Sequence, residues 1–286
     1  MLNYRIGGLL GDFINCLSVP KRIYDLTGER ANVYICDHED EPFKYGLNNT
    51  YNDLKPILLG QPYIESFKIY NNEHIDIDML NFRSSAKTQR RFFHRQRTPI
   101  NLYWLEFLFL MYIGLKLLPP TVIFYETPSI FEKSAPPENF KWLYPTKIYS
   151  EYKNTVILNR PDYRVIREGT IERYNSVIEK NETLFLCYEE DHYNNFPLKH
   201  KTTLLHKQNL EEIFNIIGSC KQFVGNQSSY YCIANALNVN RVIEVNRPGC
   251  WRMYERESEY YNNVSKFGHT RFRPRPGRPP WCRMFK

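Results

Sequence analysis

The stretch that decides the fold is Tyr4-Arg5-Ile6 followed by Gly7-Gly8-Leu9-Leu10-Gly11-Asp12. The first three residues predict a short strand, the glycines a tight turn, and the amphipathic run of residues 13–26 a helix. A second strand is predicted at residues 31–36, just before the acidic residues 37–41. The order strand, glycine-rich turn, helix, strand is typical of a βαβ unit, and such units build parallel sheets.

This alternation of strands and helices is predicted in both halves of the chain. In the first half, further strands are predicted at residues 64–70, 74–79 and 121–125. In the second half, the pattern predicts strands at 155–159, 184–188, 222–225 and 241–245, with helices at 171–179, 210–219 and 230–237. Between the halves, residues 127–145 are rich in proline, which blocks regular structure and favours a linker or hinge. We therefore expect an α/β protein with domains at residues 1–145 and 146–250, a cleft between them, and an extension at 251–286.

Composition narrows the class of protein without choosing a function. The 286 residues carry 38 Lys and Arg against 31 Asp and Glu, a net charge of +7 that suits anionic partners such as phosphorylated metabolites, nucleic acid or a lipid surface. The seven cysteines are scattered and form no Cys-x-x-Cys pair, which argues against metal clusters and a disulfide framework. The first residues lack the pattern of a secretory signal, so a cytoplasmic protein is expected.

The most apolar stretch, residues 101–118, is just long enough to cross a bilayer. Glu106 and Lys116 lie inside it, and charged side chains at bilayer depth are costly, so we predict a buried helix of a soluble domain rather than a membrane span. Residues 87–97 mix cations with aromatic side chains, and residues 271–283 are basic and proline-rich. Either segment fits a solvated surface or a weak contact with anionic lipid or another polyanion.

The first turn predicts a site for an anion or a reacting hydroxyl. Gly8 and Gly11 let the backbone approach a ligand closely and leave amide N–H groups at the positive end of the following helix. The spacing matches neither the dinucleotide motif G-x-G-x-x-G nor a phosphate-binding loop with Lys-Ser/Thr. Asp12 falls where the helix begins, so it is either an N-cap or a carboxylate able to take a proton from a hydroxyl nucleophile.

Polar residues also follow the strands of the second half. Because ligands of open α/β sheets bind outside the carboxyl ends of the strands, we expect these residues to contact a phosphate-bearing ligand through arginine, carboxylate, hydroxyl and amide groups. The alternatives are a solvated turn in which arginine pairs with Asp162, and simple helix caps. The candidate ligand-binding residues are Asn159, Arg160, Arg164, Tyr188, Glu190, Asn226, Gln227, Ser228 and Ser229.

Several of these segments resemble the heptosyltransferase-like glycosyltransferases, glycosyltransferase family 9, which have the GT-B fold. Residues 223–239 (FVGNQSSYYCIANALNV) are similar to that family's F-I-G-N-D-S-G-P-x-H-I-A-A-A-L-G-V, and residues 8–18 (GLLGDFINCLS) to its G-x-L-G-D-x-I-x-x-L-P. Residues 76–79 resemble its D-x-x-I-D-L strand and residues 104–114 its Y-L-x-L-L-x-x-L-G helix. These segments occur in the family's order along the chain.

The resemblance implies two Rossmann-like domains whose parallel sheets face a central cleft, with an acceptor bound by the first and a nucleotide-sugar donor by the second. It implies an inverting glycosyltransferase that needs no metal or other cofactor, with Asp12 as the general base and the residues after the second-half strands on the donor. Gln227, Ser229 and Cys232 stand where the family has Asp, Gly and His, which indicates a donor other than ADP-heptose. The extension at 251–286 would pack back on the N-terminal domain.

Other readings stay open from the sequence. Residues 7–9, 159–163 and 228–230 loosely resemble fucosyltransferases of related GT-B shape, which use a GDP-sugar. A sugar-nucleotide epimerase would use the same scaffold, and a non-catalytic protein could bind nucleic acid through the basic segments. Asp76 and Asp78 form a D-x-D pair that could hold a divalent metal, although their place in an alternating strand favours a structural role.

Overall fold

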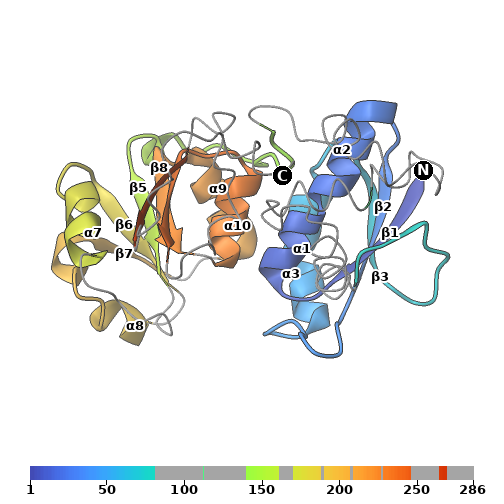
Figure 1. Ribbon diagram of the computed structural model, residues 1–286, viewed down its shortest axis with the longest axis horizontal. Coiled ribbons are helices and arrows are strands. Elements are labelled where there is room, and N and C mark those ends of the chain that lie inside the picture. The colour runs from blue at the N-terminus through green and yellow to red at the C-terminus, as the bar shows by residue number, and fades with distance from the viewer. Residues whose placement is uncertain are drawn as a thin grey trace, which may run out of the picture.

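The computed structural model describes residues 1–80, 112, 140–160, 170–187, 190–206, 209–226, 228–245 and 264–268. Within these residues the chain forms two parallel sheets with helices packed on them, as Figure 1 shows. The first sheet has the strand order β3-β2-β1-β4, with β1 at Leu2–Gly7, β2 at Ala31–Cys36, β3 at Ile64–Ile69 and β4 at Ile77–Asp78. We call the described residues 1–80 the N-terminal lobe.

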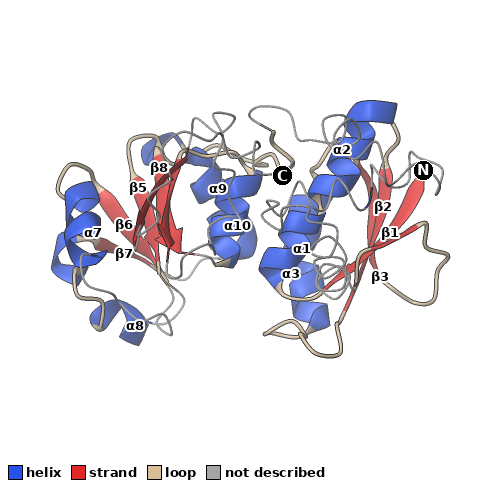
Figure 2. Ribbon diagram, in the orientation of Figure 1, coloured by secondary structure: helices blue, strands red, loops and turns tan. Residues whose placement is uncertain are grey.

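The helices of the N-terminal lobe lie on the side of its sheet that faces the rest of the molecule (Figures 1 and 2). They are α1 (Leu10–Cys16), α2 (Ser18–Thr27) and α3 (Leu47–Leu59). The predicted helix of residues 13–26 is thus two helices separated only by Leu17, and the second ends at Gly28 in the left-handed conformation that glycine adopts without strain. In β1, Tyr4 and Ile6 are buried in the core while Asn3 and Arg5 are half-buried, which is the alternation of a strand.

The second sheet has six strands in the order β10-β9-β8-β5-β6-β7, all parallel to their neighbours. The strands are β5 (Val156–Asn159), β6 (Thr183–Leu186), β7 (Thr203–Leu205), β8 (Gln222–Asn226), β9 (Arg241–Val245) and β10 (Val264–Gly268). The helices are α7 (Thr170–Ile178), α8 (Glu190–Asn194), α9 (Leu210–Ser219) and α10 (Ser229–Ala236), with single 3₁₀ turns at Ser150–Tyr152 and Lys199–Lys201. We call described residues 150–268 the C-terminal lobe.

Strand β10 belongs to the predicted C-terminal extension. Its five residues pair with β9 and so extend the sheet of the C-terminal lobe. Parallel pairing with β9 satisfies the backbone groups of these five residues. The packing of the extension on the N-terminal domain stays an expectation. The rest of the extension lies outside the described residues, as do residues 87–97, the predicted strand at 121–125 and, except for Tyr112, the apolar stretch of residues 101–118.

The two lobes share one core. Helices α9 and α10 lie on the side of the C-terminal lobe that faces the N-terminal lobe (Figure 1), where α10 contacts α1 and α9 contacts α3. One continuous cluster of buried side chains includes Phe13 and Leu54 from the first lobe and Phe214 and Tyr231 from the second. The lobes are therefore joined by packed helices that lie between the two sheets.

Residues 140–149, the connecting segment, tie both lobes together. Trp142 is fully buried, and its indole N–H donates to the Ile14 carbonyl of α1 at 2.8 Å. The backbone N–H of Trp142 donates to the Ala236 carbonyl of α10 at 3.1 Å, and the hydroxyl of Tyr63 donates to the Trp142 carbonyl at 2.7 Å. The described part of the predicted proline-rich hinge is thus hydrogen-bonded to both lobes, and its residues Phe140, Trp142 and Leu143 are buried.

Among the described residues, no helix combines the length and the apolar character that crossing a membrane requires.

Candidate functional site

The start of α1 is shaped by the glycines that follow β1. Gly8 has a φ of 92°, a conformation that side-chain-bearing residues rarely adopt. A Cβ at Gly7 would lie 2.5 Å from the Cys36 carbonyl oxygen, so only glycine fits where β1 passes the end of β2. The turn therefore needs these glycines for backbone reasons before any ligand is considered.

Asp12 is the third residue of α1 rather than its N-cap. Leu9 is in the N-cap position with an extended backbone, and its side chain makes no capping hydrogen bond. The N-cap alternative for Asp12 is therefore wrong. Asp12 is only 6% exposed and lies in the first turn, where the positive end of the helix dipole favours a carboxylate.

The start of α10 joins the carboxyl ends of three strands. Ser228 is its N-cap: the Ser228 hydroxyl oxygen accepts from the Tyr231 backbone N–H at 3.3 Å. The same hydroxyl donates to Oδ1 of Asn159 at 3.1 Å, and Nδ2 of Asn159 donates to the Leu186 carbonyl at 2.8 Å. One serine thus links the ends of β5 and β6 to the first turn of α10, and the backbone N–H groups of a helix start are suited to an anion.

Asn226, the last residue of β8, has an unusual environment. Its side chain is fully buried, and within the part of the chain that the structure describes neither Oδ1 nor Nδ2 has a hydrogen-bond partner. Burying such a group without a partner costs about 1–3 kcal/mol, so its retention calls for an explanation such as an incoming ligand group or water. Asn226 lies two residues before the N-cap of α10, in the same turn of chain.

Arg160 directly follows β5 and pairs with the buried side chain of Glu244, which is bonded in turn to the buried Tyr174. Its Nε donates to Oε2 of Glu244 at 3.0 Å, and the hydroxyl of Tyr174 donates to the same oxygen at 2.7 Å. Arg160 and Glu244 are 3% and 1% exposed. Burial and the neighbouring Glu244 charge raise the pKa of Tyr174 well above its usual value, so this hydroxyl keeps its proton. The alternative in which Arg160 lies in a solvated turn is wrong, because its side chain is buried and pairs with Glu244.

The two helix starts meet between the lobes. A Cβ at Gly11 of α1 would lie 3.1 Å from Sγ of Cys232 and 3.5 Å from Cα of Ser229, both on α10. One turn further along α1, Nδ2 of Asn15 donates to the Cys232 sulfur at 3.6 Å. The turn that carries Asp12 is therefore packed against the first turn of α10, as the side-by-side helices in Figure 1 illustrate.

The remaining predicted site residues are exposed, make structural contacts or lie outside the described residues. Glu190 is the exposed first residue of α8, and Arg164, Tyr188 and Gln227 lie outside the described residues. The D-x-D pair makes structural contacts: Asp78 pairs with Arg5, and Asp76 accepts from the Asn3 backbone N–H at 2.8 Å. In the part of the chain that the structure describes, no three His, Cys, Asp or Glu side chains are grouped so that they could hold a metal ion.

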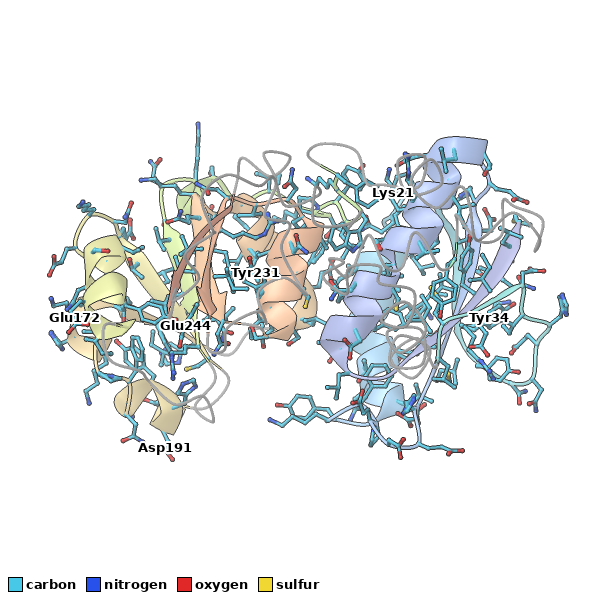
Figure 3. All side chains as sticks on the ribbon, in the orientation of Figure 1. Lys21, Tyr34, Glu172, Asp191, Tyr231 and Glu244 are labelled. Atoms are coloured by element: carbon cyan, nitrogen blue, oxygen red, sulfur yellow. The ribbon has the colours of Figure 1, made fainter. Side chains whose placement is uncertain are left out.

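Sequence reasoning missed Glu244 and Tyr174. Figure 3 labels Glu244 in the interior of the C-terminal lobe, and Arg160, which donates to its carboxylate, is 84 positions away in the chain. One signal was present, because Glu244 interrupts the apolar strand Arg241–Val245 with a carboxylate. A charged residue in such a strand needs a partner, and an arginine at the end of a nearby strand was the obvious candidate.

Two parallel sheets with helices packed between them define a two-lobed α/β protein with the GT-B fold, which the family resemblance implied. Among solved structures, the chain is similar to E. coli heptosyltransferase WaaC with ADP, with a TM-score of 0.50, 12% identity and coverage of 93% of each chain. At this identity the likeness concerns the fold.

Two further solved structures are similar at lower scores. One is E. coli heptosyltransferase WaaC with ADP-2-deoxy-2-fluoro heptose, at a TM-score of 0.48, 11% identity and coverage of 93% of each chain. The other is a glycosyl transferase of family 9 from Veillonella parvula DSM 2008, at a TM-score of 0.45 and 12% identity, covering 93% of this chain and 86% of the other. No protein-family model matches the chain, and no curated protein matches it.

Proposed function

We propose that the protein is an inverting glycosyltransferase that moves a sugar from a nucleoside-diphosphate sugar to a hydroxyl group of a glycan acceptor without a metal. The acceptor binds at the start of α1 and the donor at the carboxyl edge of the C-terminal sheet. The fold shared with E. coli heptosyltransferase WaaC, solved with ADP, supports a nucleotide on this scaffold.

The observation that carries the proposal is the packing of Gly11 against Ser229 and Cys232. It brings a turn that contains a buried carboxylate next to a helix start suited to an anion. A sugar transferase needs this juxtaposition, because a base for the acceptor and a stabiliser for the departing diphosphate must lie on opposite sides of one reacting carbon.

The reaction follows from these positions. Asp12 takes the proton of the acceptor hydroxyl while the hydroxyl oxygen forms a bond to C1 of the sugar. The bond from C1 to the diphosphate oxygen breaks, and attack opposite the leaving group inverts the configuration at C1. The negative charge that develops on the nucleoside diphosphate is stabilised by the first backbone N–H groups of α10, by Ser229 and by Arg160. Ser228 holds this helix start in place, because its hydroxyl donates to Asn159 and accepts from the Tyr231 N–H. The buried amide of Asn226 gains a partner when the donor binds.

The test separates binding from turnover. Melting temperatures are measured with ADP, GDP and UDP, and the nucleotide that stabilises most identifies the donor class. Sugar esters of that nucleotide are then incubated with a panel of p-nitrophenyl glycosides as acceptors, and release of the nucleoside diphosphate is followed. We expect Asp12→Asn to reduce release by a factor of about 10²–10⁴ while the nucleotide-induced shift in melting temperature is retained.

The matched control is Asp53→Asn, which removes an exposed carboxylate from α3 and should leave turnover unchanged. If Asp12→Asn is folded and turns over like the wild type, the assignment of the base is wrong. If none of the three nucleotides stabilises the wild-type protein, the glycosyltransferase proposal itself fails. Conversion of the donor sugar in the absence of any acceptor would identify an epimerase instead.

A further inference from the structure

Tyr174, Glu244 and Arg160 are buried polar residues that hydrogen bonds connect near the carboxyl end of β8. Tyr174 on α7 donates to Glu244 at the end of β9, and Glu244 accepts from Nε of Arg160 at 3.0 Å and from its Nη2 at 3.5 Å. Strand β8 lies between β5 and β9, with Asn226 next to Glu244 in register. The chain of side chains therefore spans the end of the strand that leads into α10.

Arg160 is also adjacent to the anion-binding helix start. Its neighbour Asn159 accepts the hydrogen bond from Ser228, the N-cap of α10. Arg160 therefore follows directly on the residue that holds the first turn of this helix, at the carboxyl end of β5 where the proposed function has the donor bind.

A stability argument alone does not account for this arrangement. Burying an ion pair removes both charges from water, and well-packed apolar side chains are often equally or more stabilising in such a place. The side-chain oxygen and nitrogen of the neighbouring Asn226 are buried and have no hydrogen-bond partner among the described residues, which is a second energetic cost at the same place. Buried polar groups that lower the stability of the fold beside a helix start indicate a site for a polar ligand.

We infer that Glu244 and Tyr174 are positioning residues that hold the Arg160 guanidinium in the orientation that binds the donor diphosphate, an inference that rests on the proposed function. A carboxylate bound to Nε and Nη2 fixes the plane of a guanidinium. The Tyr174 hydroxyl in turn fixes the carboxylate, so the position of α7 is transmitted to Arg160. Diphosphate recognition thereby depends on a hydroxyl that need not touch the donor.

The test uses Tyr174→Phe, which removes this hydroxyl without changing any charge. Affinities for ADP, GDP and UDP are measured by calorimetry, and the tightest of these is compared with its own nucleoside, measured by competition. We expect Tyr174→Phe to weaken the nucleoside diphosphate on the order of tenfold and to leave the nucleoside within about twofold. In an Arg160→Gln background, Tyr174→Phe should cause no further loss, because its effect acts through Arg160.

The matched control is Tyr193→Phe in the same lobe. The Tyr193 hydroxyl donates to the carbonyls of Lys199 and Thr202 at 2.9 and 2.6 Å, so the variant loses a tyrosine hydroxyl that is bonded to backbone instead of Glu244 and should bind both ligands normally. If Tyr174→Phe does not fold, Glu244→Asp decides the matter: it keeps the charge, shortens the side chain, and should show the same selective loss.

The outcomes separate the inference from the proposed function. Equal weakening of nucleoside and diphosphate, no weakening, or an undiminished effect in the Arg160→Gln background would overturn the positioning role. In those cases the wild-type affinity for the nucleotide would still support the glycosyltransferase. Failure of the wild type to bind ADP, GDP or UDP would instead remove the proposed function.

Discussion

At the scale of single residues, Gly11 shows how a local preference and a tertiary contact compete. Alanine is favoured over glycine within a helix by up to about 1 kcal/mol, so the sequence of α1 alone would predict a gain from Gly11→Ala. The structure predicts the opposite, because the new Cβ would lie 3.1 Å from the Cys232 sulfur. Overpacking of this kind typically costs about 1–3 kcal/mol.

We therefore expect Gly11→Ala to lower the free energy of unfolding by about 1–2 kcal/mol, measured by urea denaturation. In a Cys232→Ala background, the same change should be neutral or stabilising, because the sulfur is gone and the Ser229 Cα, at 3.5 Å, is at an ordinary contact distance. Stabilisation by Gly11→Ala in the wild-type background would show that the two helix starts are not packed as described.

At the scale of elements, α3 is the longer of two described α-helices, with α8, that the sequence pattern did not predict. Its residues Leu47–Leu59 include Asn48, Asn49 and Asn52, which have low helix propensity. They also include Pro56, which lies inside the helix and lacks the N–H group for a helical hydrogen bond. The buried residues Thr50, Leu54, Ile57 and Leu58 nevertheless follow helical spacing. Burial of this face against β2, β3 and α9 stabilises a helix that its own propensity does not favour.

Replacing Pro56 with alanine should therefore stabilise the protein. The side chain is exposed, so no packing is lost, and the new N–H group can donate within the helix. We expect the free energy of unfolding to rise by about 1–2 kcal/mol after allowance for the greater freedom of the unfolded chain. Lys55→Ala, at the adjacent exposed position, should change it by less than about 0.5 kcal/mol. Urea denaturation of both variants makes the comparison, and a loss in Pro56→Ala would contradict the helix at this point.

At the scale of the whole molecule, the two lobes are joined more firmly than the proline-rich linker predicted. The connecting segment is bonded on both sides: Gln61 Nε2 donates to the Tyr144 carbonyl at 3.1 Å, and Oδ1 of Asn215 accepts from the Thr146 backbone N–H at 2.9 Å. A Cβ at Gly218 would lie 2.9 Å from Pro145, so α9 closely approaches this segment. Together with the shared core, these contacts couple the lobes.

We accordingly expect both lobes to unfold in one cooperative transition. Hydrogen exchange under increasing urea should show peptides from residues 1–36 and from residues 222–245 losing protection at the same concentration, because the core cluster includes side chains from both. Asn215→Ala, which removes the bond to the connecting segment, should lower this common midpoint. Two separate midpoints in the wild-type protein would show that the lobes are independent.

The strands and most helices were predictable because their patterns are local. The expected strands at residues 31–36 and 241–245 and the helix at 210–219 agree with β2, β9 and α9 at both ends. Elements were missed where the local pattern was weak, as in α3 and the three-residue β7, or where the strand lay beyond the last expected element, as in β10. These form because neighbouring elements provide a surface or a ladder for them.

The sequence by itself determined the order of strands and helices in the βαβ units, the glycine turn before Asp12 and the hydroxyl that begins α10. Each of these features depends on a few adjacent residues. Only the tertiary structure decided that the turn of Asp12 packs against α10, that Arg160 pairs with Glu244, and that Trp142 holds the lobes together. These contacts join residues that are tens to hundreds of positions apart. Burial and charge pairing over such separations depend on how the elements pack, which no local pattern encodes.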